Sequence, residues 1–391
     1  MKFSTLFSPV ALAALVRAQS KGTAFGFAAG TTGGGTATPV YPTTNDQLVG
    51  YLTDSSARVI MIDRTFDFRS SAGTTTTNCC SDDRTTKCPG GTSQGQLWIQ
   101  DTCDSGTWVS CTYNNAPRTP IDVKSNKSLV GVGTKGIIMG KGLRLRGGVS
   151  NIIIQNIHFT ELNPQFVWGG DAITLDGTDK VWIDHNKFSL IGRQMIVSGW
   201  GAAGHVTISD NEFDGRSTWS AGCNGKHYWT ALLIGLKDWY TLSGNYFHDL
   251  SGRAPHIGTT ATSSAIVMHA INNYFENIGG HAFDVDNNVD LLIEGNYFQT
   301  VTTPITSASY TNGGRIYYIQ TVAEASNASG QLGYIPEWNR GSGSGTSATL
   351  ANTNALSVLG QYKSAITWSH WAVADVPANV KSIAGIGKIG N

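Results

Sequence analysis

The segment "YTLSGNYF" (residues 240–247) decides the fold, because the chain repeats its pattern several times. Each copy has apolar or β-branched residues and then an Asn placed two positions before a Phe. The closing Phe residues of five copies are 25, 34, 28 and 23 residues apart. Such self-similarity is typical of supersecondary units that stack on one another. The other copies are "VWIDHNKF" (181–188), "VTISDNEF" (206–213), "AINNYF" (270–275), "LLIEGNYF" (291–298) and the looser "IIIQNIHF" (152–159).

Each copy reads as a short strand followed by a polar corner, and no helical pattern separates the copies. Strands that stack about 4.8 Å apart give an all-β fold, the parallel β-helix, in which extra residues leave as loops on one side. The repeated Asn tolerates left-handed backbone angles at a corner and can hydrogen-bond to its counterpart one coil away. The repeated Phe then packs inside the stack. A β-sandwich with coincidental Asn-x-Phe corners is the alternative.

The composition fits a turn-rich β protein, since the 391 residues include 47 Gly and only 14% are charged. This length suffices for one large domain or two medium ones. Lys and Arg together number 27, as do Asp and Glu, so the net charge is zero. A nucleic-acid-binding protein usually carries a basic excess, and we therefore expect no nucleic-acid partner. A neutral polymer, or one whose charge is masked, fits better.

The first 18 residues are typical of a secretory signal peptide. Lys2 supplies a positive charge, an apolar run follows over residues 10–16, and small residues precede a cleavage point after Ala18. The run is too short to span a bilayer, so we expect no membrane anchor. Residues 1–18 are thus expected to be removed from a secreted, extracellular protein. Residues 19–391 are expected to form one β-helix domain that acts as a monomer.

Six cysteines in a secreted chain predict three disulfides. Five lie within residues 79–111, which predicts an irregular, cross-linked loop, and the distant sixth must be tied to one of them. A zinc site is not expected, because paired Cys-x-x-Cys units are missing from the sequence. The cysteines are Cys79, Cys80, Cys88, Cys103, Cys111 and Cys223. Two sequons, at Asn126 and Asn327, predict glycosylation; the first lies in an expected strand and the second in a Gly/Ser-rich surface stretch.

The longest gap between copies contains "DGRSTWSAGCNGKHYW" (214–229), an insertion rich in aromatic residues. In a secreted chain with 11 Trp, indole rings that stack on sugars are one interpretation, and core packing is the other. Trp219, Tyr228 and Trp229 of this insertion are the candidates for contact with a sugar.

Charged residues recur on one flank of the predicted stack. Asp171 follows Trp168 in "VWGGDAITL", Arg193 follows the 181–188 strand, and Arg253 precedes Pro255, which fixes the backbone there. Equivalent positions of successive coils lie about one strand spacing apart, so these three charged side chains can converge. An Arg253 that is paired with Asp249, or simply solvated, is the alternative.

The motifs "WGGDAITL" (168–175), "VWIDH" (181–185) and "SGRAP" (251–255) together resemble the pectin lyases of the superfamily that also contains the pectate lyases. The resemblance covers nearly all of the mature chain and weakens after about residue 310. It implies a right-handed parallel β-helix and calcium-independent β-elimination on methyl-esterified homogalacturonan, with no cofactor and no metal. It also implies a disulfide between Cys88 and Cys223, which leaves the other four cysteines to pair among themselves.

The resemblance also implies roles for single residues. Arg253 matches the catalytic arginine, for which the family role is proton acceptor; as arginine is normally protonated, stabilisation of an enolate is the physical minimum. Arg193 matches the residue that replaces a calcium-binding carboxylate of the pectate lyases, and Asp171 matches the remaining carboxylate. Trp168 and Trp229 match aromatic residues of the substrate cleft. The candidates Tyr228, Trp219 and His256 complete the expected cleft, and Trp98 and Trp108 match it loosely.

Three other functions are weighed against this one. A calcium-dependent pectate lyase would need a carboxylate cluster, which Asp176, Asp179 and Asp184 beside Asp171 leave open, although Arg193 argues against it. A hydrolase would need a pair of carboxylates flanking the scissile bond, and the sequence offers no convincing pair. A catalytically inactive, polysaccharide-binding β-helix is the third.

One residue departs from the family pattern. Where the family usually has "SGRxPK", this chain has "SGRAPH", so His256 replaces a lysine that is thought to help hold the carboxyl ester or the enolate. A histidine is charged only at acidic pH. We therefore expect activity to fall as pH rises, and we expect His256→Lys to extend the pH–rate profile towards alkaline pH. An unchanged profile would contradict this expectation.

Overall fold

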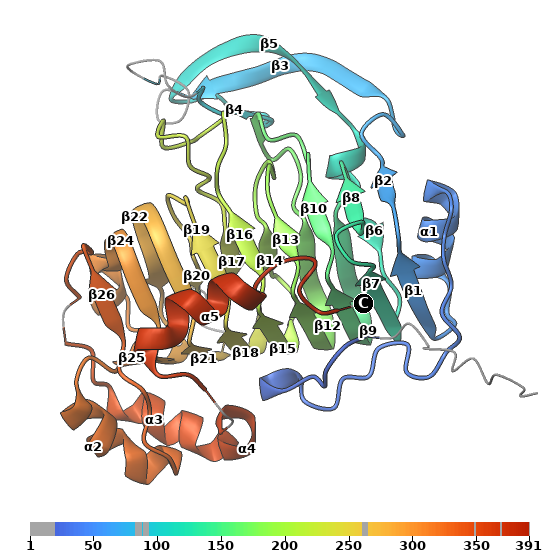
Figure 1. Ribbon diagram of the computed structural model, residues 1–391. Helices are drawn as coiled ribbons and strands as arrows, with labels where there is room; N and C mark the ends of the chain where they lie inside the picture. Colours follow the sequence, from blue (N-terminus) through green and yellow to red (C-terminus); the bar gives the residue numbers. More distant parts are fainter. Residues whose placement is uncertain are drawn as a thin grey trace, which may run out of the picture.

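The repeated segments stack in register as parallel strands in the computed structural model of the chain (Figure 1). One column of paired residues runs through five coils: Val181, Val206, Tyr240, Met268 and Leu291. All five are buried. The parallel β-helix expected from the repeat is thereby confirmed. The structure describes residues 20–82, 88, 94–259, 265–347, 349–367 and 370–390, so the expected signal peptide lies outside it.

The solenoid has three rows of strands. The first row contains β6 (Ile121–Asp122), the first part of β9 (Leu143–Gln155), the first part of β12 (Ile173–Asp184), β14 (Ile196–Ser198), β17 (Ala231–Leu233), β20 (His256–Ile257) and the end of β22 (Tyr274–Val285). The second contains β1 (Arg58–Ile62), β7 (Lys127–Gly131), the ends of β9 and β12, β15 (Gly204–Ser209), β18 (Lys237–Ser243), β21 (Ala265–Ile271), β23 (Val289–Glu294) and β25 (Arg315–Tyr318). The third contains β2 (Thr65–Asp67), β8 (Ile137–Met139), β10 (His158–Thr160), β13 (Lys187–Phe188), β16 (Glu212–Asp214), β19 (Tyr246–His248), the start of β22, β24 (Tyr297–Ile305) and β26 (Arg340–Ser342).

The repeated asparagines form a buried ladder at the corner between the second and third rows. Each side-chain amide donates to the carboxamide oxygen of the next coil at 2.9–3.0 Å, and that oxygen also accepts the backbone N–H of the first coil. Every polar atom of a buried amide thereby gains a partner, which a buried polar group requires. The ladder extends one coil beyond the repeat and consists of Asn186, Asn211, Asn245, Asn273, Asn296 and Asn339.

The sequence suggested that the repeated asparagine has left-handed backbone angles at each corner. In the structure, the residue before the asparagine has them instead. His185, Asp210 and Asn272 have φ of 52–53°, and Gly244 and Gly295 occupy the same place in their coils. These residue types tolerate the left-handed region better than β-branched ones do. The asparagine side chain is thus left free for the ladder.

The repeated phenylalanines form a stack inside the solenoid. Neighbouring rings lie nearly parallel with centroids 4.4–5.6 Å apart, all fully buried. Aliphatic side chains from all three rows fill the rest of this core. The stack consists of Phe159, Phe188, Phe213, Phe247, Phe275 and Phe298.

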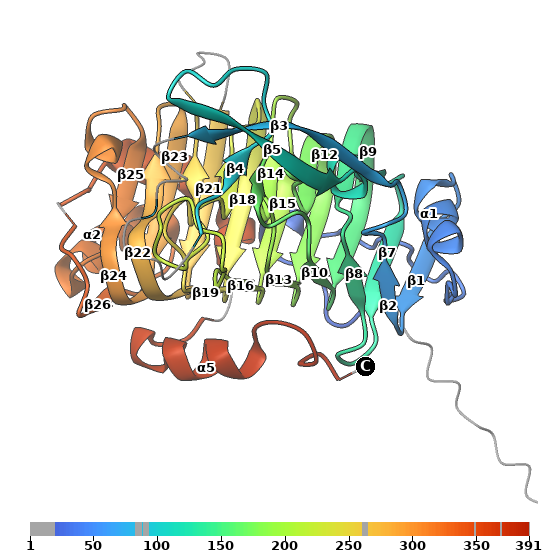
Figure 2. The same cartoon turned by 90° about the horizontal axis from the view of Figure 1, so that it is seen from above.

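Helices and the chain ends cover two of the three outer faces. α1 (Asn45–Thr53) places Leu48 and Leu52 in the core at the first coil. η1 (Gly26–Ala28) and the C-terminal helices α2 (Val322–Leu332), α3 (Thr353–Leu359) and α4 (Lys363–Ile366) pack on the second row. α5 (Val376–Ile383) lies along the third row (Figure 2). The short 3₁₀ turns are η2 (Ala116–Arg118), η3 (Ser307–Tyr310), η4 (Gly360–Tyr362) and η5 (Val373–Asp375).

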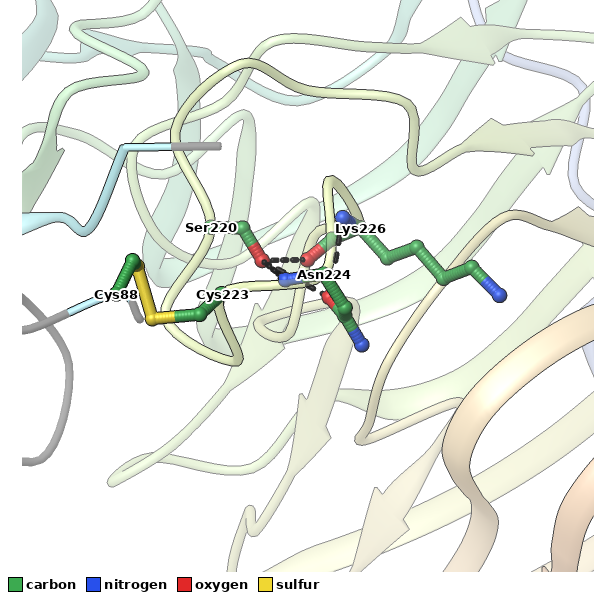
Figure 3. The surroundings of a disulfide bond; sticks show 5 residues. All are labelled: Cys88, Ser220, Cys223, Asn224 and Lys226. Atoms are coloured by element: carbon green, nitrogen blue, oxygen red, sulfur yellow. Dashed lines mark hydrogen bonds between the residues drawn. A yellow bond between two sulfur atoms is a disulfide. The ribbon is translucent and has the colours of Figure 1, made fainter. Parts of the chain in front are cut away.

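A small second sheet arches over the solenoid (Figure 1). It consists of the hairpin β3 (Thr74–Asp82) and β5 (Gly106–Asn114), with β4 (Leu97–Trp98) and β11 (Phe166–Val167). Disulfides Cys79–Cys111 and Cys80–Cys103 cross-link it internally. The bond between Cys88 and Cys223 ties it to the aromatic insertion, as the resemblance implied (Figure 3). There Ser220 Oγ donates to the side-chain oxygen of Asn224 and to the carbonyl of Lys226, which fixes the loop around the disulfide.

Both sequon asparagines are exposed. Asn327 lies on the helix α2. Asn126 lies just before β7 with a φ of 60°, and its side chain accepts a hydrogen bond from Asn151. No helix in the described part of the chain combines the length and the apolarity needed to cross a bilayer.

The ladder predicts the effect of removing one of its members. Asn211→Ala deletes the acceptor of Asn186 and the donor to Asn245 in a site with no access to water. We expect a loss of about 2–4 kcal/mol in the free energy of unfolding, because several buried polar groups lose their partners together. Urea denaturation monitored by circular dichroism measures this loss. The exposed Asn354→Ala is the control and should change stability by less than about 0.5 kcal/mol; equal effects of the two variants would contradict a stabilising ladder.

Candidate active site

Four of the expected site residues occupy the same turn of successive coils. Asp171 lies two residues before β12, Arg193 three before β14, Trp229 two before β17 and Arg253 three before β20. These strands are neighbours in the first row, so the turns that lead into them lie side by side. The structure therefore brings together the residues that were singled out from separate motifs.

Arg193 is packed between a carboxylate and an indole. Its Nε lies 3.2 Å from Asp171 Oδ1, and its guanidinium carbon lies 3.8 Å from the centre of the Trp168 ring. Burial lowers the pKa of Arg193; Asp171 raises it and the charge of Arg253 lowers it further. Burial likewise raises the pKa of Asp171, whose Oδ1 also accepts the backbone N–H of Gln194 at 2.9 Å. The positive charge of Arg193 is thus fixed in place by contacts on two sides.

Arg253 is held through its backbone. Its φ of 49° is in the left-handed region, its carbonyl accepts from Ala231 at 2.7 Å, and its N–H donates to Nε2 of His281 at 3.2 Å. An acceptor nitrogen requires a neutral ring, and burial lowers the pKa of His281 accordingly. Asp249 pairs with His248 and accepts from Asn277, rather than with Arg253 as the alternative interpretation had it.

Aromatic rings surround the Arg253 side chain. Its guanidinium carbon lies 4.9 Å from the ring centre of Trp229 and 5.8 Å from that of Tyr228. The Trp229 indole donates to Gln96 Oε1 at 2.9 Å and contacts Trp98 edge to face at 5.7 Å. A cation over an aromatic face is stabilised without a counter-ion, so the charge of Arg253 stays available to a ligand.

Two adjoining cavities form the cleft under the small sheet. One has a volume of about 450 Å³ and is lined by Trp98, Trp168, Trp200, Trp229, Arg193 and Arg253 among others. The other has a volume of about 350 Å³ and shares Trp168 and Arg193 with the first. Among the described residues that line the two cavities, Asp171 is the only carboxylate.

Three expected cleft residues lie elsewhere. Trp219 lines a separate cavity beneath the small sheet, beside Gln94, with which it forms a β-bridge. Trp108 is exposed on β5. His256 belongs to the first row, but its Nδ1 lies 2.7 Å from Asp284 Oδ2 and its Nε2 lies 3.5 Å from Asp286 Oδ2. Its side chain thus faces two carboxylates and does not line either of the two cavities described above.

The structure adds three residues that the sequence did not single out. Trp200 lines the larger cavity with 67% of its surface exposed; its signal was an indole between glycines directly after a strand, in "SGWGAAG" (198–204). Gln96 anchors Trp229 from the small sheet, and His281 supports Arg253 from the next coil. No local pattern marks Gln96 or His281, because their partners are distant in sequence.

The carboxylates near Asp171 in sequence have their own partners. Asp176 accepts the N–H of Gly201, Asp179 pairs with His205, and Asp184 accepts from Gln155, His185 and Ser209. Within the described ranges, the groupings of acidic and histidine side chains compact enough to hold a metal are Asp184 with His185 and Asp210, and Glu212 with Asp214 and His248. Neither grouping lines the cleft.

The sequence is similar to curated fungal proteins over its whole length. It is 62% identical to the probable pectin lyase F-1 of Aspergillus terreus over 390 residues, which cover all of both chains. It is 61% identical to the probable pectin lyase E of Aspergillus fumigatus, over 97% of this chain and 98% of the relative.

Solved structures share the fold at low identity. A pectate lyase bound to a hexasaccharide aligns with a TM-score of 0.59 and 19% identity, over 96% of this chain and all of the other. A pectate lyase of Bacillus sp. N165, in complex with trigalacturonate, aligns with a TM-score of 0.56 and 20% identity, over 93% of this chain and 99% of the other. The family model described as "Pectate lyase" matches residues 4–329. The chain belongs to the pectate lyase family.

Proposed function

We propose that the protein is a pectin lyase, which cleaves methyl-esterified (1→4)-α-D-galacturonan by β-elimination and without calcium. One observation carries the proposal: two arginines, Arg193 and Arg253, line an aromatic cavity, and Asp171 in the adjoining cavity is the only carboxylate among the described residues that line the two. The names of the full-length fungal relatives support the same activity.

The chemistry requires stabilisation of an enolate. The C5 proton passes to a base, the role that the resemblance gives to Arg253 in its neutral form. The electron pair of the C5–H bond then forms an enolate with its negative charge on the C6 carbonyl oxygen, because C5 is α to that carbonyl. This pair forms the C4–C5 double bond as the C4–O bond breaks, and the departing glycosidic oxygen keeps the pair of that bond and takes a proton from water. Fixed positive charge in a site sheltered from water stabilises the charge of the enolate strongly.

We propose that Arg253 acts at the C5–H group of the reacting sugar and that Arg193 stabilises the negative charge of the developing enolate. Arg253 is the more central, since rings surround it and two backbone hydrogen bonds set its direction. Arg193 is immobilised between Asp171 and Trp168 and supplies charge without reorganisation. Asp171 orients Arg193, and Trp168, Trp200 and Trp229 offer faces on which sugar rings can stack.

The lining of the larger cavity favours an ester over a free acid at the sugar that reacts. Its floor is formed by Val197 and Leu232, and its walls are largely indole. An uncharged methyl ester loses little hydration there, whereas a carboxylate would lose much. The ester also withdraws electrons from C5 more effectively than a carboxylate does.

The donor set does not fit a calcium ion. Ca²⁺ takes about six to eight oxygen ligands, and a single carboxylate paired with a guanidinium offers too few. We propose further that the chain is secreted, with residues 1–18 removed and residues 19–391 acting as one catalytic domain; its three disulfides suit an oxidising compartment. We propose that it acts as a monomer, because its own segments cover the outer faces of the second and third rows, and that the exposed Asn327 and Asn126 carry glycans.

Ultraviolet absorbance of the unsaturated product tests the function. Highly methylated pectin and polygalacturonate are each incubated with chelator and with added calcium. We expect absorbance to rise on methylated pectin in the presence of chelator. We expect Arg253→Ala to lower kcat by about 100- to 1,000-fold, and Arg253→Lys, which keeps the charge, to lower it less.

Two outcomes would reject the proposal. Product formation only on polygalacturonate with calcium would indicate a pectate lyase and a different role for Arg193. A lack of product on both polymers would indicate a binding protein.

The support of Arg253 by His281 predicts an acidic limit of activity. Burial lowers the pKa of His281 from its ordinary value of 6.5. The ring therefore stays neutral as the pH falls past 6.5 and becomes protonated only when the pH falls through the lowered pKa. Protonation removes the acceptor of the Arg253 N–H and adds charge beside Arg253 and His256, which Asp284 offsets only in part. We expect kcat/KM to fall at acidic pH. His281→Gln keeps an acceptor that does not titrate and should move this limb to lower pH, whereas His205→Gln, whose ring stacks on Trp239 away from the cleft, should not.

A further inference from the structure

The smaller cavity of the cleft differs in chemistry from the larger one. Arginines line it, namely Arg118, Arg144 and Arg193, together with Pro117 and Pro120. It adjoins the aromatic cavity through Trp168 and Arg193, which line both. A polymer that crosses the aromatic cavity therefore continues into a basic one.

The floor of the cleft shows the same change from coil to coil. Outward-facing residues of the first row form one lateral series, in which each pairs with the next. The series begins with charged residues, becomes apolar where it lines the larger cavity, and is polar again at its end: Asp122, Arg144, Thr174, Val197, Leu232 and His256. The boundary between Thr174 and Val197 coincides with the boundary between the cavities.

Of the three arginines that line this cavity, only Arg118 has no carboxylate partner among the residues that the structure describes. Arg144 is paired with Asp122 through two hydrogen bonds of 2.7 and 3.1 Å, and Arg193 is paired with Asp171. Arg118 is exposed at the end of η2, and its Nη1 donates to the Tyr113 hydroxyl at 2.9 Å. That bond and the Tyr113 ring, 5.1 Å away, hold the guanidinium in place without neutralising it.

A planar guanidinium with free donors matches a carboxylate. A methyl ester offers no charge to such a group, whereas the C6 carboxylate of an unesterified sugar does. We propose that the smaller cavity, which Arg118 lines, is a subsite for an unesterified galacturonate. The protein would then select pectin with a free acid near, but not at, the sugar that reacts. This inference rests on the proposed pectin lyase function and adds a specificity to it.

The test compares kcat/KM on fully methylated homogalacturonan and on the same polymer after random partial de-esterification. We expect the partly de-esterified polymer to be the better substrate. Mass spectrometry of its products should show free acids enriched at one fixed distance from the new chain end. In Arg118→Gln we expect the ratio of the two kcat/KM values to fall about five-fold and the enrichment to disappear, while Arg118→Lys keeps part of both.

Arg340→Gln is the matched control, because it removes an exposed arginine from the last coil, on β26. It should leave the ratio unchanged. A wild-type ratio at or below one, or the same ratio in Arg118→Gln as in the wild type, would overturn the subsite while leaving the pectin lyase function intact. A protein that forms product from neither polymer would overturn the proposed function itself and the subsite with it.

Discussion

The lateral register between coils is the constraint on which the rest of the molecule depends. Backbone pairing and the asparagine ladder hold each coil at one position above its neighbour, and a slip of one residue would turn every inward side chain outward. Because the register is fixed, the place of a residue within its coil determines its neighbours. Arg193 and Arg253 are far apart in sequence but occupy equivalent turns of neighbouring coils, and so their charges interact.

The covering of the solenoid explains why the cleft lies where it does. The outer faces of the second and third rows carry large apolar side chains such as Trp182, Tyr274 and Tyr317, and the N-terminal segment and the C-terminal helices bury them. The first row has a mixed outer face and a separate sheet above it. One disulfide to the insertion, the pairing of β4 with β11 and a small apolar cluster around Tyr113 and Phe166 hold that sheet, and the cavities of the cleft lie beneath it. The space for a polymer thus lies between the first row and the small second sheet.

The sequence was sufficient to predict the features that recur in each coil, but not the contacts that occur only once. The fold followed from five copies of one pattern, and Asp171, Arg193 and Arg253 followed from motifs at equivalent points of successive coils. Trp219 belongs to the same insertion as Trp229, yet the two line different cavities, because the insertion bends around Cys223 before it rejoins the stack. The contacts of Gln96 and His281 join segments with no shared pattern, and only the three-dimensional structure identifies them.

The unequal spacing of the repeat has an evolutionary consequence. Each loop leaves the solenoid at one strand end and returns at the next, and the ladder absorbs none of its length. Insertions or deletions in one loop therefore alter one wall of the cleft while the turn that carries the arginines keeps its geometry. Related chains can in this way exchange the surfaces that select a polymer and inherit the reacting groups unchanged, which separates the evolution of selectivity from that of catalysis.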